Sequence, residues 1–374
     1  MKVNKERLIK EFQKLVSIDS PTHGEREIGT YVKNRMQALG FQVEEDDAGM
    51  KLGGNCGNIY GFLPGTIDGE PILFSGHMDT VEPSSGKKAV IHPDGKITSA
   101  GDTILGADDA AAIAEILEAV ESIQEQGIDY PSIEVLFSVA EEIYCRGADV
   151  FDFSKIKSKR AYVFDLPGEI GIAANKAPAI VVFTVMIRGK ASHAGFAPEE
   201  GCHAVLAASR AISRIEMGHV SDDAVVNVGL IKGGIATNIV PELCEVRGEI
   251  RSYSQREAEE LVLATKSVFE EAAGEIGAKA EFSYHFDCYP YAHSENCPTI
   301  KFFRKVCEDM GLSGKLVSSF GGSDNNIFAK NGMEGIVITN AMNQCHSLDE
   351  YTSIDDLYQV AVLAARLMIY SDKG

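Results

Sequence analysis

Apolar residues near the start of the chain recur at the spacing of helices. This pattern predicts a helix over residues 5–16. Thr22 followed by Glu25 has the form of a capping box, and with Gly40 beyond it predicts a second helix with a defined start and end. The N-terminal part of the chain therefore begins with two amphipathic helices.

Continuous apolar runs farther along the chain are typical of buried strands, and they predict strands near 58–63, 71–76, 132–139 and 160–164. A helix is predicted between them, over residues 109–126. Strands that alternate with helices favour an α/β fold, in which helices cover both faces of a parallel or mixed sheet.

The pattern changes at residue 179. From here the chain reads as strand, helix, two strands, helix and strand, the βαββαβ order of a small antiparallel sheet with two helices on one face. After Pro290 the α/β alternation returns. We therefore predict a main α/β domain over residues 1–178 and 291–374, interrupted over residues 179–290 by a smaller, inserted ferredoxin-like domain.

Composition narrows the class of protein. The 374 residues carry 35 basic and 55 acidic side chains, a formal charge of -20 that disfavours binding to nucleic acid or to anionic membranes. The N-terminal segment lacks a secretion-signal pattern, and the sequence contains no apolar run of membrane-spanning length. The eight cysteines are scattered without a C-x-x-C pair, which predicts a reduced, cytoplasmic protein.

Ionisable residues follow the predicted strands at several places. The segments concerned contain His77 and Asp79, Asp108 and Asp109, Glu141 and Glu142, Asp165, and His346. Because ligands of open α/β sheets bind beyond the carboxyl ends of the strands, we expect these groups to meet at one edge. Each has an ordinary structural explanation when taken alone, such as a turn or a helix N-terminus. Together they would repel one another unless a cation compensates.

Two imidazoles and several carboxylates suit two divalent ions that share a bridging carboxylate and a water molecule. Within the pair Glu141 and Glu142, one residue would bind metal and the other would transfer protons, and spacing alone does not decide which. Asp79, two residues after His77, is placed to accept the ring N–H of that histidine.

The motifs SGHMDTV, LGADDAAAIA, SVAEEI, VFDLPG, SHAGFAPEEG, ATNIVPE, GGSDNN and CHSLDEY occur in this order over most of the chain. In this set the chain resembles the di-zinc metallopeptidases that include peptidase T, glutamate carboxypeptidase and aminoacylase, and it is most similar to peptidase T-like proteins. The resemblance implies two Zn²⁺ per subunit, with Co²⁺ or Mn²⁺ as alternatives.

The resemblance also implies a role for each motif residue. His77 and Asp165 would hold one zinc, Glu142 and His346 the other, and Asp108 would bridge them. Glu141 would activate the bridging water as general base, Asp79 would orient His77, and a cis peptide would join Asp108 to Asp109. The resemblance further implies that the inserted domain is a lid or dimerisation domain. In a homodimer formed through this lid, His193 would stabilise the substrate oxyanion. The implied substrate contacts are Asn238, Arg251, Gly322 and Ser323.

Two positions depart from the family pattern. Phe320 stands where peptidase T has a basic residue that grips a peptide carboxylate, and a phenyl ring cannot replace a guanidinium there. Ala110 stands where many relatives have lysine after the two aspartates. The first departure leaves open whether the substrate is a tripeptide, a dipeptide or an N-acyl amino acid. The second predicts that the properties of the metal site are adjusted and that the site itself is retained.

The sequence thus predicts a zinc-dependent exopeptidase, an aminopeptidase that acts on di- or tripeptides. One alternative is an N-acyl amino-acid amidohydrolase with the same di-zinc site. An alternative from another class is a catalytically silent metal-binding protein. Cysteine catalysis through Cys345 or Cys145 is disfavoured, because adjacent residues such as Cys345 and His346 rarely reach nucleophile–base geometry.

Overall fold

The computed structural model describes residues 1–369, and the contacts within them divide into two compact units. Unit 1 comprises Met1–Asn175, His293–Ser319 and the chain from Ser323, whereas unit 2 comprises Lys176–Ala292 and Phe320–Gly322. The boundaries predicted at residues 179 and 290 lie close to those of unit 2. In addition, the short segment 320–322 belongs with unit 2, which the sequence pattern does not indicate.

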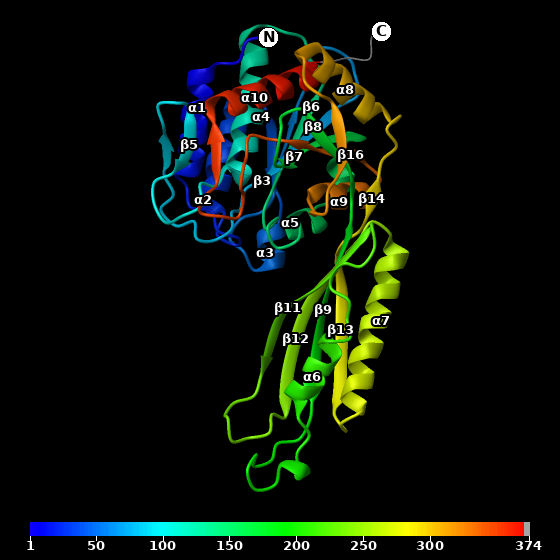
Figure 1. The fold of residues 1–374 in the computed structure, drawn as a ribbon. Helices are drawn as coiled ribbons and strands as arrows, with labels where there is room; N and C mark the ends of the chain where they lie inside the picture. The colour runs from blue at the N-terminus through cyan, green and yellow to red at the C-terminus, as the bar shows by residue number, and fades with distance from the viewer. Residues whose placement is uncertain (370–374) are drawn as a thin grey trace. The chain divides into compact units, whose positions relative to one another are not determined.

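Most elements of unit 1 lie at the positions that the apolar pattern predicts (Figure 1). Its helices are α1 (Lys5–Val16), α2 (Arg26–Ala38), α3 (Ala48–Leu52), α4 (Ala107–Glu125), α5 (Arg146–Asp149), α8 (Pro298–Met310), α9 (Asp324–Lys330) and α10 (Ile354–Ile369). Its longer strands are β2 (Ile59–Leu63), β3 (Ile72–His77), β6 (Ile133–Ser138), β7 (Arg160–Leu166) and β16 (Glu334–Thr339).

Six of the remaining strands of unit 1 have no clear signal in the sequence pattern. They are β1 (Gln42–Glu45), β4 (Ala89–Ile91), β5 (Lys96–Ser99), β8 (Ile172–Ala177), β14 (Tyr291–Ala292) and β17 (Tyr351–Ser353). The seventh, β15 (Lys315–Ser318), lies where the α/β alternation returns after Pro290. β4, β5 and β17 form a separate three-stranded sheet.

The main sheet is mixed, as expected. Among the described residues it has nine strands in the order β1-β2-β6-β3-β7-β16-β8-β14, with β15 paired to β8. β3 and β6 are buried along their whole length, which explains why both read as continuous apolar runs. Helix α4 packs on β3, and α1 and α10 pack in turn on α4 (Figure 1).

The second helix begins differently from the prediction. Helix α2 starts at Arg26 and is capped by neither Thr22 nor Glu25, since the N–H of Arg26 donates to Asn55 Oδ1 at 2.9 Å. The Thr22 hydroxyl instead donates to Asp79, and the Glu25 carboxylate accepts a hydrogen bond from Ala140. The capping-box prediction is therefore wrong, because both side chains bind partners that are distant in sequence.

Unit 2 is a twisted antiparallel sheet with two helices. Its strands are β9 (Ala179–Arg188), β10 (Gly218–His219), β11 (Ala224–Gly233), β12 (Leu243–Ser252) and β13 (Lys279–Cys288), in the order β10-β11-β12-β9-β13. Helices α6 (Ala204–Ile212) and α7 (Gln255–Gly274) contact each other and pack on β9 and β12 (Figure 1). The predicted order of strand, helix, two strands, helix and strand is present in β9, α6, β11, β12, α7 and β13, and the two-residue strand β10 before β11 is an addition to it.

Within residues 1–369, no helix combines the length and the apolar character needed to cross a lipid bilayer.

Candidate active site

The ionisable residues of unit 1 gather at one edge of the main sheet because neighbouring strands run parallel. β3 pairs in parallel with β6 and β7, and β16 pairs in parallel with β7. Their carboxyl ends therefore lie together. β3 ends at His77, β6 leads into the turn with Glu141 and Glu142, and Asp165 lies near the end of β7. This is the crowding that the sequence predicts.

The carboxylate of Asp108 lies between two imidazoles. Its Oδ1 is 3.0 Å from His77 Nε2, and its Oδ2 is 3.2 Å from His346 Nε2. The same His346 nitrogen lies 3.0 Å from Glu142 Oε2. One carboxylate that directs each of its oxygens to a different histidine has the arrangement of a bridging ligand between two cations.

Two overlapping groups of side chains offer ligand atoms that lie within 4.8 Å of one another. His77, Glu141 and Asp165 form one group, and His77, Asp108 and Glu142 form the other. Glu142 Oε1 is buried and has no hydrogen-bond partner among the described residues. Nitrogen and carboxylate oxygen donors together suit zinc or a similar divalent ion, so these residues fit a metal centre.

The electrostatics of the cluster lead to the same interpretation. Burial raises the pKa of Glu141 and of Asp165 well above the usual carboxyl range, and neighbouring carboxylates raise both further. Burial also acts to raise the pKa of Asp108, but hydrogen bonds with His346 and His77 lower it below its usual value. The hydrogen bonds with Asp108 and Glu142 raise the pKa of His346 to about 10. So many buried acids need protons or cations to neutralise them.

Asp79 contacts both halves of the cluster. Its backbone carbonyl lies 2.9 Å from His77 Nδ1, which fixes the orientation of the ring. Its carboxylate lies farther from that nitrogen, at 3.6 Å, and accepts hydrogen bonds from the backbone N–H groups of Glu141 at 2.9 Å and Glu142 at 3.2 Å. Asp79 thus connects the histidine with the glutamate turn.

The start of α4 is shaped to present Asp108. The Asp108–Asp109 peptide bond is cis, as the resemblance implies, and Gly106 before it has a φ of 75° that favours glycine. Glu350 accepts hydrogen bonds from the backbone N–H groups of Gly106 at 2.7 Å and Asp108 at 3.0 Å. The segment that carries His346 therefore also holds the backbone of Asp108.

The predicted residues of unit 2 lie in two places. His193 and Asn238 are neighbours, because the N–H of Ala194 donates to the carbonyl of Asn238 at 2.9 Å. Arg251 forms an ion pair with Glu249 at 2.9 Å and donates from Nη1 to the carbonyl of Phe320 at 2.7 Å.

The two remaining predicted contacts lie on either side of the unit boundary. Gly322 ends the segment assigned to unit 2, and Ser323 begins α9 in unit 1.

Four residues have contacts around the site that the sequence pattern does not predict. Asp109 and Glu350 lie within the quoted motifs, Thr22 is predicted as a helix cap, and Asn340 lies outside the motifs. Their partners are distant in sequence, and the local pattern contains no signal for them.

The two cysteines considered as nucleophiles are poorly suited to that role. Burial raises the pKa of Cys345, which disfavours a thiolate, and the ring of the adjacent His346 faces Asp108 and Glu142. Cys145 donates from Sγ to Glu141 Oε1 at 3.2 Å.

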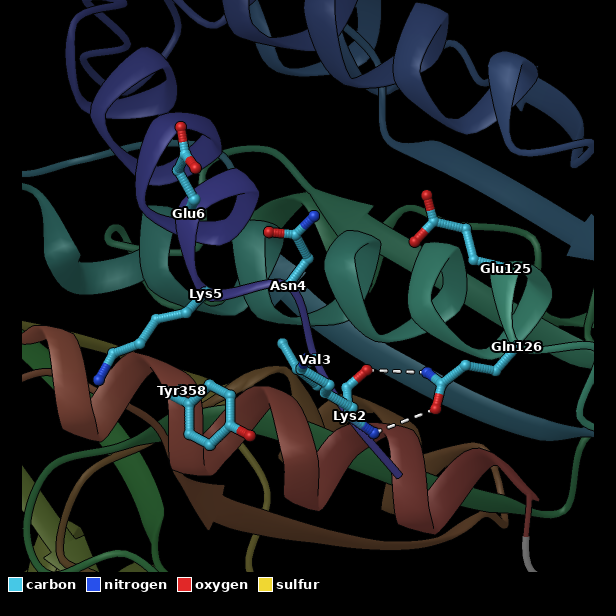
Figure 2. A pocket seen from close by; sticks show the side chains of 8 residues that line it. All are labelled: Lys2, Val3, Asn4, Lys5, Glu6, Glu125, Gln126 and Tyr358. Atoms are coloured by element: carbon cyan, nitrogen blue, oxygen red, sulfur yellow. Dashed lines mark hydrogen bonds between the residues drawn. The ribbon is translucent and has the colours of Figure 1, made fainter.

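A cavity of about 730 Å³ lies elsewhere in unit 1 and shares no residue with the cluster. Figure 2 shows the polar side chains along its wall. Among them, the side-chain amide of Gln126 accepts a hydrogen bond from the backbone N–H of Lys2 and donates one to the backbone carbonyl of Lys2. Lys5 forms an ion pair with Asp355 at 2.6 Å. These polar groups have partners within the protein, so the cavity is not a candidate catalytic site.

Known proteins share this architecture along nearly the whole chain. "Uncharacterized protein YqjE" of Bacillus subtilis is 34% identical over 98% of both chains. The structure of a tripeptidase from Staphylococcus aureus superposes with a TM-score of 0.95 at 32% identity, covering 98% of both chains. The aminopeptidase PepT from Bacillus cereus superposes with a TM-score of 0.90 at 34% identity, again over 98% of both.

The family model "Peptidase family M20/M25/M40" matches residues 73–370, which include both predicted glutamates and both predicted histidines of the site. The candidate ligand groups lie within this range. The chain therefore belongs to peptidase family M20/M25/M40 and is a metallopeptidase.

Proposed function

We propose that this protein is a peptidase T-like aminopeptidase that hydrolyses the N-terminal amide bond of di- or tripeptides with two Zn²⁺ per subunit. The observation that supports it best is the Asp108 carboxylate, which directs one oxygen to His77 and the other to His346. The similarity to a tripeptidase and to PepT supports the substrate class.

The residues divide into two ligand sets around Asp108. His77 and Asp165 would hold one ion, and Glu142 and His346 the other, with Asp108 between them. Bound divalent ions would supply Lewis acidity and neutralise the buried carboxylates. The residues of the cluster then have to hold the ligands in position and keep protons from competing with the ions for them. Asp79 serves the first purpose, because its backbone carbonyl holds the His77 ring.

Glu141 is the proposed general base. Its backbone N–H is anchored on Asp79, and its carboxylate lies within the group that contains His77 and Asp165. From there it would accept a proton from the attacking water and deliver it to the nitrogen of the leaving amine. The pair Glu141 and Glu142 would thus divide proton transfer and metal binding between them.

His193 is the proposed stabiliser of the substrate oxyanion in a homodimer formed through unit 2. Its Nδ1 accepts hydrogen bonds from the N–H groups of Gly195 at 3.1 Å and Phe196 at 3.2 Å, so Nε2 carries the proton and is available as a donor. The ring is stacked on Phe196 and lies on an exposed loop. An N–H donor of this kind suits the developing charge on a carbonyl oxygen.

We further propose that the protein works in the cytoplasm. All eight cysteines are free thiols, which suits a reducing compartment. The acidic chain would have neither nucleic acid nor membrane as a partner. Asn238, Arg251, Gly322 and Ser323 are the proposed contacts to the small peptide substrate.

A substrate panel tests the proposal directly. Zinc-loaded protein is assayed with free dipeptides, free tripeptides and N-acetyl amino acids, with and without a chelator. We expect chelator-sensitive release of the N-terminal residue from the free peptides. Faster turnover of the acetylated substrates would instead identify a deacylase, and metal binding without turnover of any substrate would indicate a catalytically silent protein.

A further inference from the structure

The segment before α2 reaches the proposed active site from a distant part of the sequence. Thr22 donates from Oγ1 to Asp79 Oδ2 at 2.8 Å, although the two residues are 57 positions apart. The same carboxylate accepts the N–H groups of Glu141 and Glu142. Asp79 is fully buried, so its charge depends on these three donors.

Glu25 also holds the turn that carries Glu141 and Glu142. Its Oε1 accepts hydrogen bonds from the backbone N–H of Ala140 at 3.1 Å and of His23 at 2.9 Å. Ala140 has a φ of 52°, in the left-handed region that is unfavourable for a residue with a Cβ. Since Ala140 directly precedes Glu141, the direction in which the glutamate pair leaves the strand depends on this conformation.

Backbone contacts fix the supporting segment itself. The N–H of Thr80 donates to the carbonyl of Ser20 at 2.9 Å, and Pro21 forms a bridge with Thr80. Thr22 and Glu25 are thus attached to the end of β3, where His77 and Asp79 lie. A rigid attachment is what allows a side-chain hydrogen bond to set the position of another element.

We propose that Thr22 and Glu25 are positioning residues that hold the turn of Glu141 and Glu142 in the geometry needed for metal binding and proton transfer. Neither belongs to the candidate ligand groups. This inference rests on the proposed function for the roles of the two glutamates, whereas the contacts themselves do not depend on it. Hydrogen-bond partners of metal ligands typically contribute 10–100-fold to metal affinity or activity.

The hydroxyl of Thr22 can be removed with little change in shape. In the Thr22→Val variant Asp79 Oδ2 loses its shortest hydrogen bond, so we expect zinc affinity and kcat each to fall about 10-fold, with KM nearly unchanged. Thr22→Ser keeps the hydroxyl and should rescue both quantities. Thr30→Val is the matched control, because the Thr30 hydroxyl donates only locally, to Arg26 O at 2.8 Å.

Glu25 is tested by a second pair of variants. Glu25→Met has similar length but lacks the acceptor for Ala140, and we expect it to lower zinc affinity and kcat in the same way. Glu25→Gln retains a carbonyl acceptor and should rescue both in part. Circular dichroism verifies folding, and if Glu25→Met does not fold, the Thr22 variants decide the question alone.

Zinc affinity is measured by titrating metal-free protein calorimetrically, without substrate. Equal zinc affinity and equal kcat in Thr22→Val and wild type would overturn the proposal, as would equal losses in Thr22→Val and Thr30→Val. If wild-type protein cleaved no peptide but Thr22→Val bound zinc more weakly than Thr22→Ser, the proposed function would fail and the positioning role would stand.

Discussion

The side-chain amide of Asn340 donates to Asp109 Oδ1 at 2.6 Å and to the carbonyl of Phe164 at 3.1 Å. The other oxygen of Asp109 accepts the backbone N–H of His77 at 3.0 Å. Asn340 follows β16, Phe164 belongs to β7, and His77 ends β3. Asn340 and Asp109 therefore connect the ends of β3, β7 and β16 to the start of α4, next to the proposed metal ligands.

The Asn340→Asp variant should be strongly destabilised. It replaces a donor by a carboxylate that faces the buried carboxylate of Asp109, and it leaves the carbonyl of Phe164 without this hydrogen bond. We expect the free energy of unfolding to fall by at least about 1–3 kcal/mol, as measured by urea denaturation. Asn331→Asp is the control, because Asn331 is exposed and its amide binds only Ile327 O within the same helix. Equal losses in the two variants would contradict the role of Asn340.

The Glu141→Gln variant separates catalysis from metal binding. The amide cannot accept a proton from water, so kcat should fall on the order of 10²–10⁴-fold. Zinc content, measured by mass spectrometry, should remain near that of wild type, because Glu142 and not Glu141 is the proposed ligand. Glu169→Gln changes an exposed glutamate of the same unit and serves as the control. Unchanged turnover in Glu141→Gln would show that another group is the base.

Asp108→Ala should remove the bridge between the two proposed ions. Its carboxylate contacts both His77 and His346, so its loss affects both ligand sets at once. We expect the bound zinc to fall from two ions toward none at micromolar free zinc. The control is Asp102→Ala, which removes an exposed carboxylate just before α4. Retention of two ions by Asp108→Ala would contradict the bridging role.

The sequence predicts the long elements and the gathering of ionisable residues at one edge of the sheet, because both depend on local patterns. β3 and β6 are fully buried and therefore read as apolar runs, and the residues that follow parallel strands meet at one edge for reasons of topology. Short strands such as β4 and β5 escape prediction, since three or four partly exposed residues have no distinctive period.

The supporting contacts could not be predicted for a different reason. Thr22 and Glu25 match the local rule for a helix cap, but their side chains bind Asp79 and Ala140, which only the tertiary fold brings near. Likewise, nothing near Asn340 in the sequence identifies Asp109 as its partner. Local patterns therefore find the residues that carry the chemistry more readily than those that hold them in place.

Phe320 gives a prediction on substrate preference. Its ring packs on Tyr253 with centroids 4.6 Å apart, and its carbonyl binds Arg251, which is itself paired with Glu249. Phe320→Arg would offer a guanidinium at the position where peptidase T-like proteins are expected to hold a carboxylate. We expect a lower KM for tripeptides with a free C-terminus and no change for the corresponding amides. Phe320→Leu controls for loss of the ring, and an equal change for acids and amides would exclude carboxylate recognition.

Glu115 gives the stability of the protein a dependence on pH. It is fully buried in α4, and neither carboxyl oxygen has a hydrogen-bond partner of ordinary geometry among the described residues. Burial raises its pKa well above the usual range, which the nearby backbone of Ala341 offsets only in part. The folded protein therefore keeps this proton over a pH range in which the unfolded chain releases it.

The sign of the effect follows from this difference. The stability that the raised pKa of Glu115 contributes is fully present below about pH 4, the pKa range of an unfolded glutamate, and is lost as pH rises through its folded pKa, by about 1.4 kcal/mol per pH unit. Glu115→Gln has no proton to lose, so its free energy of unfolding relative to wild type should increase by about 1–3 kcal/mol between pH 5 and pH 7. Urea denaturation at both pH values measures this, with Glu27→Gln as an exposed control in α2. A difference between variant and wild type that stays constant over this range would mean that Glu115 does not hold its proton in the folded protein.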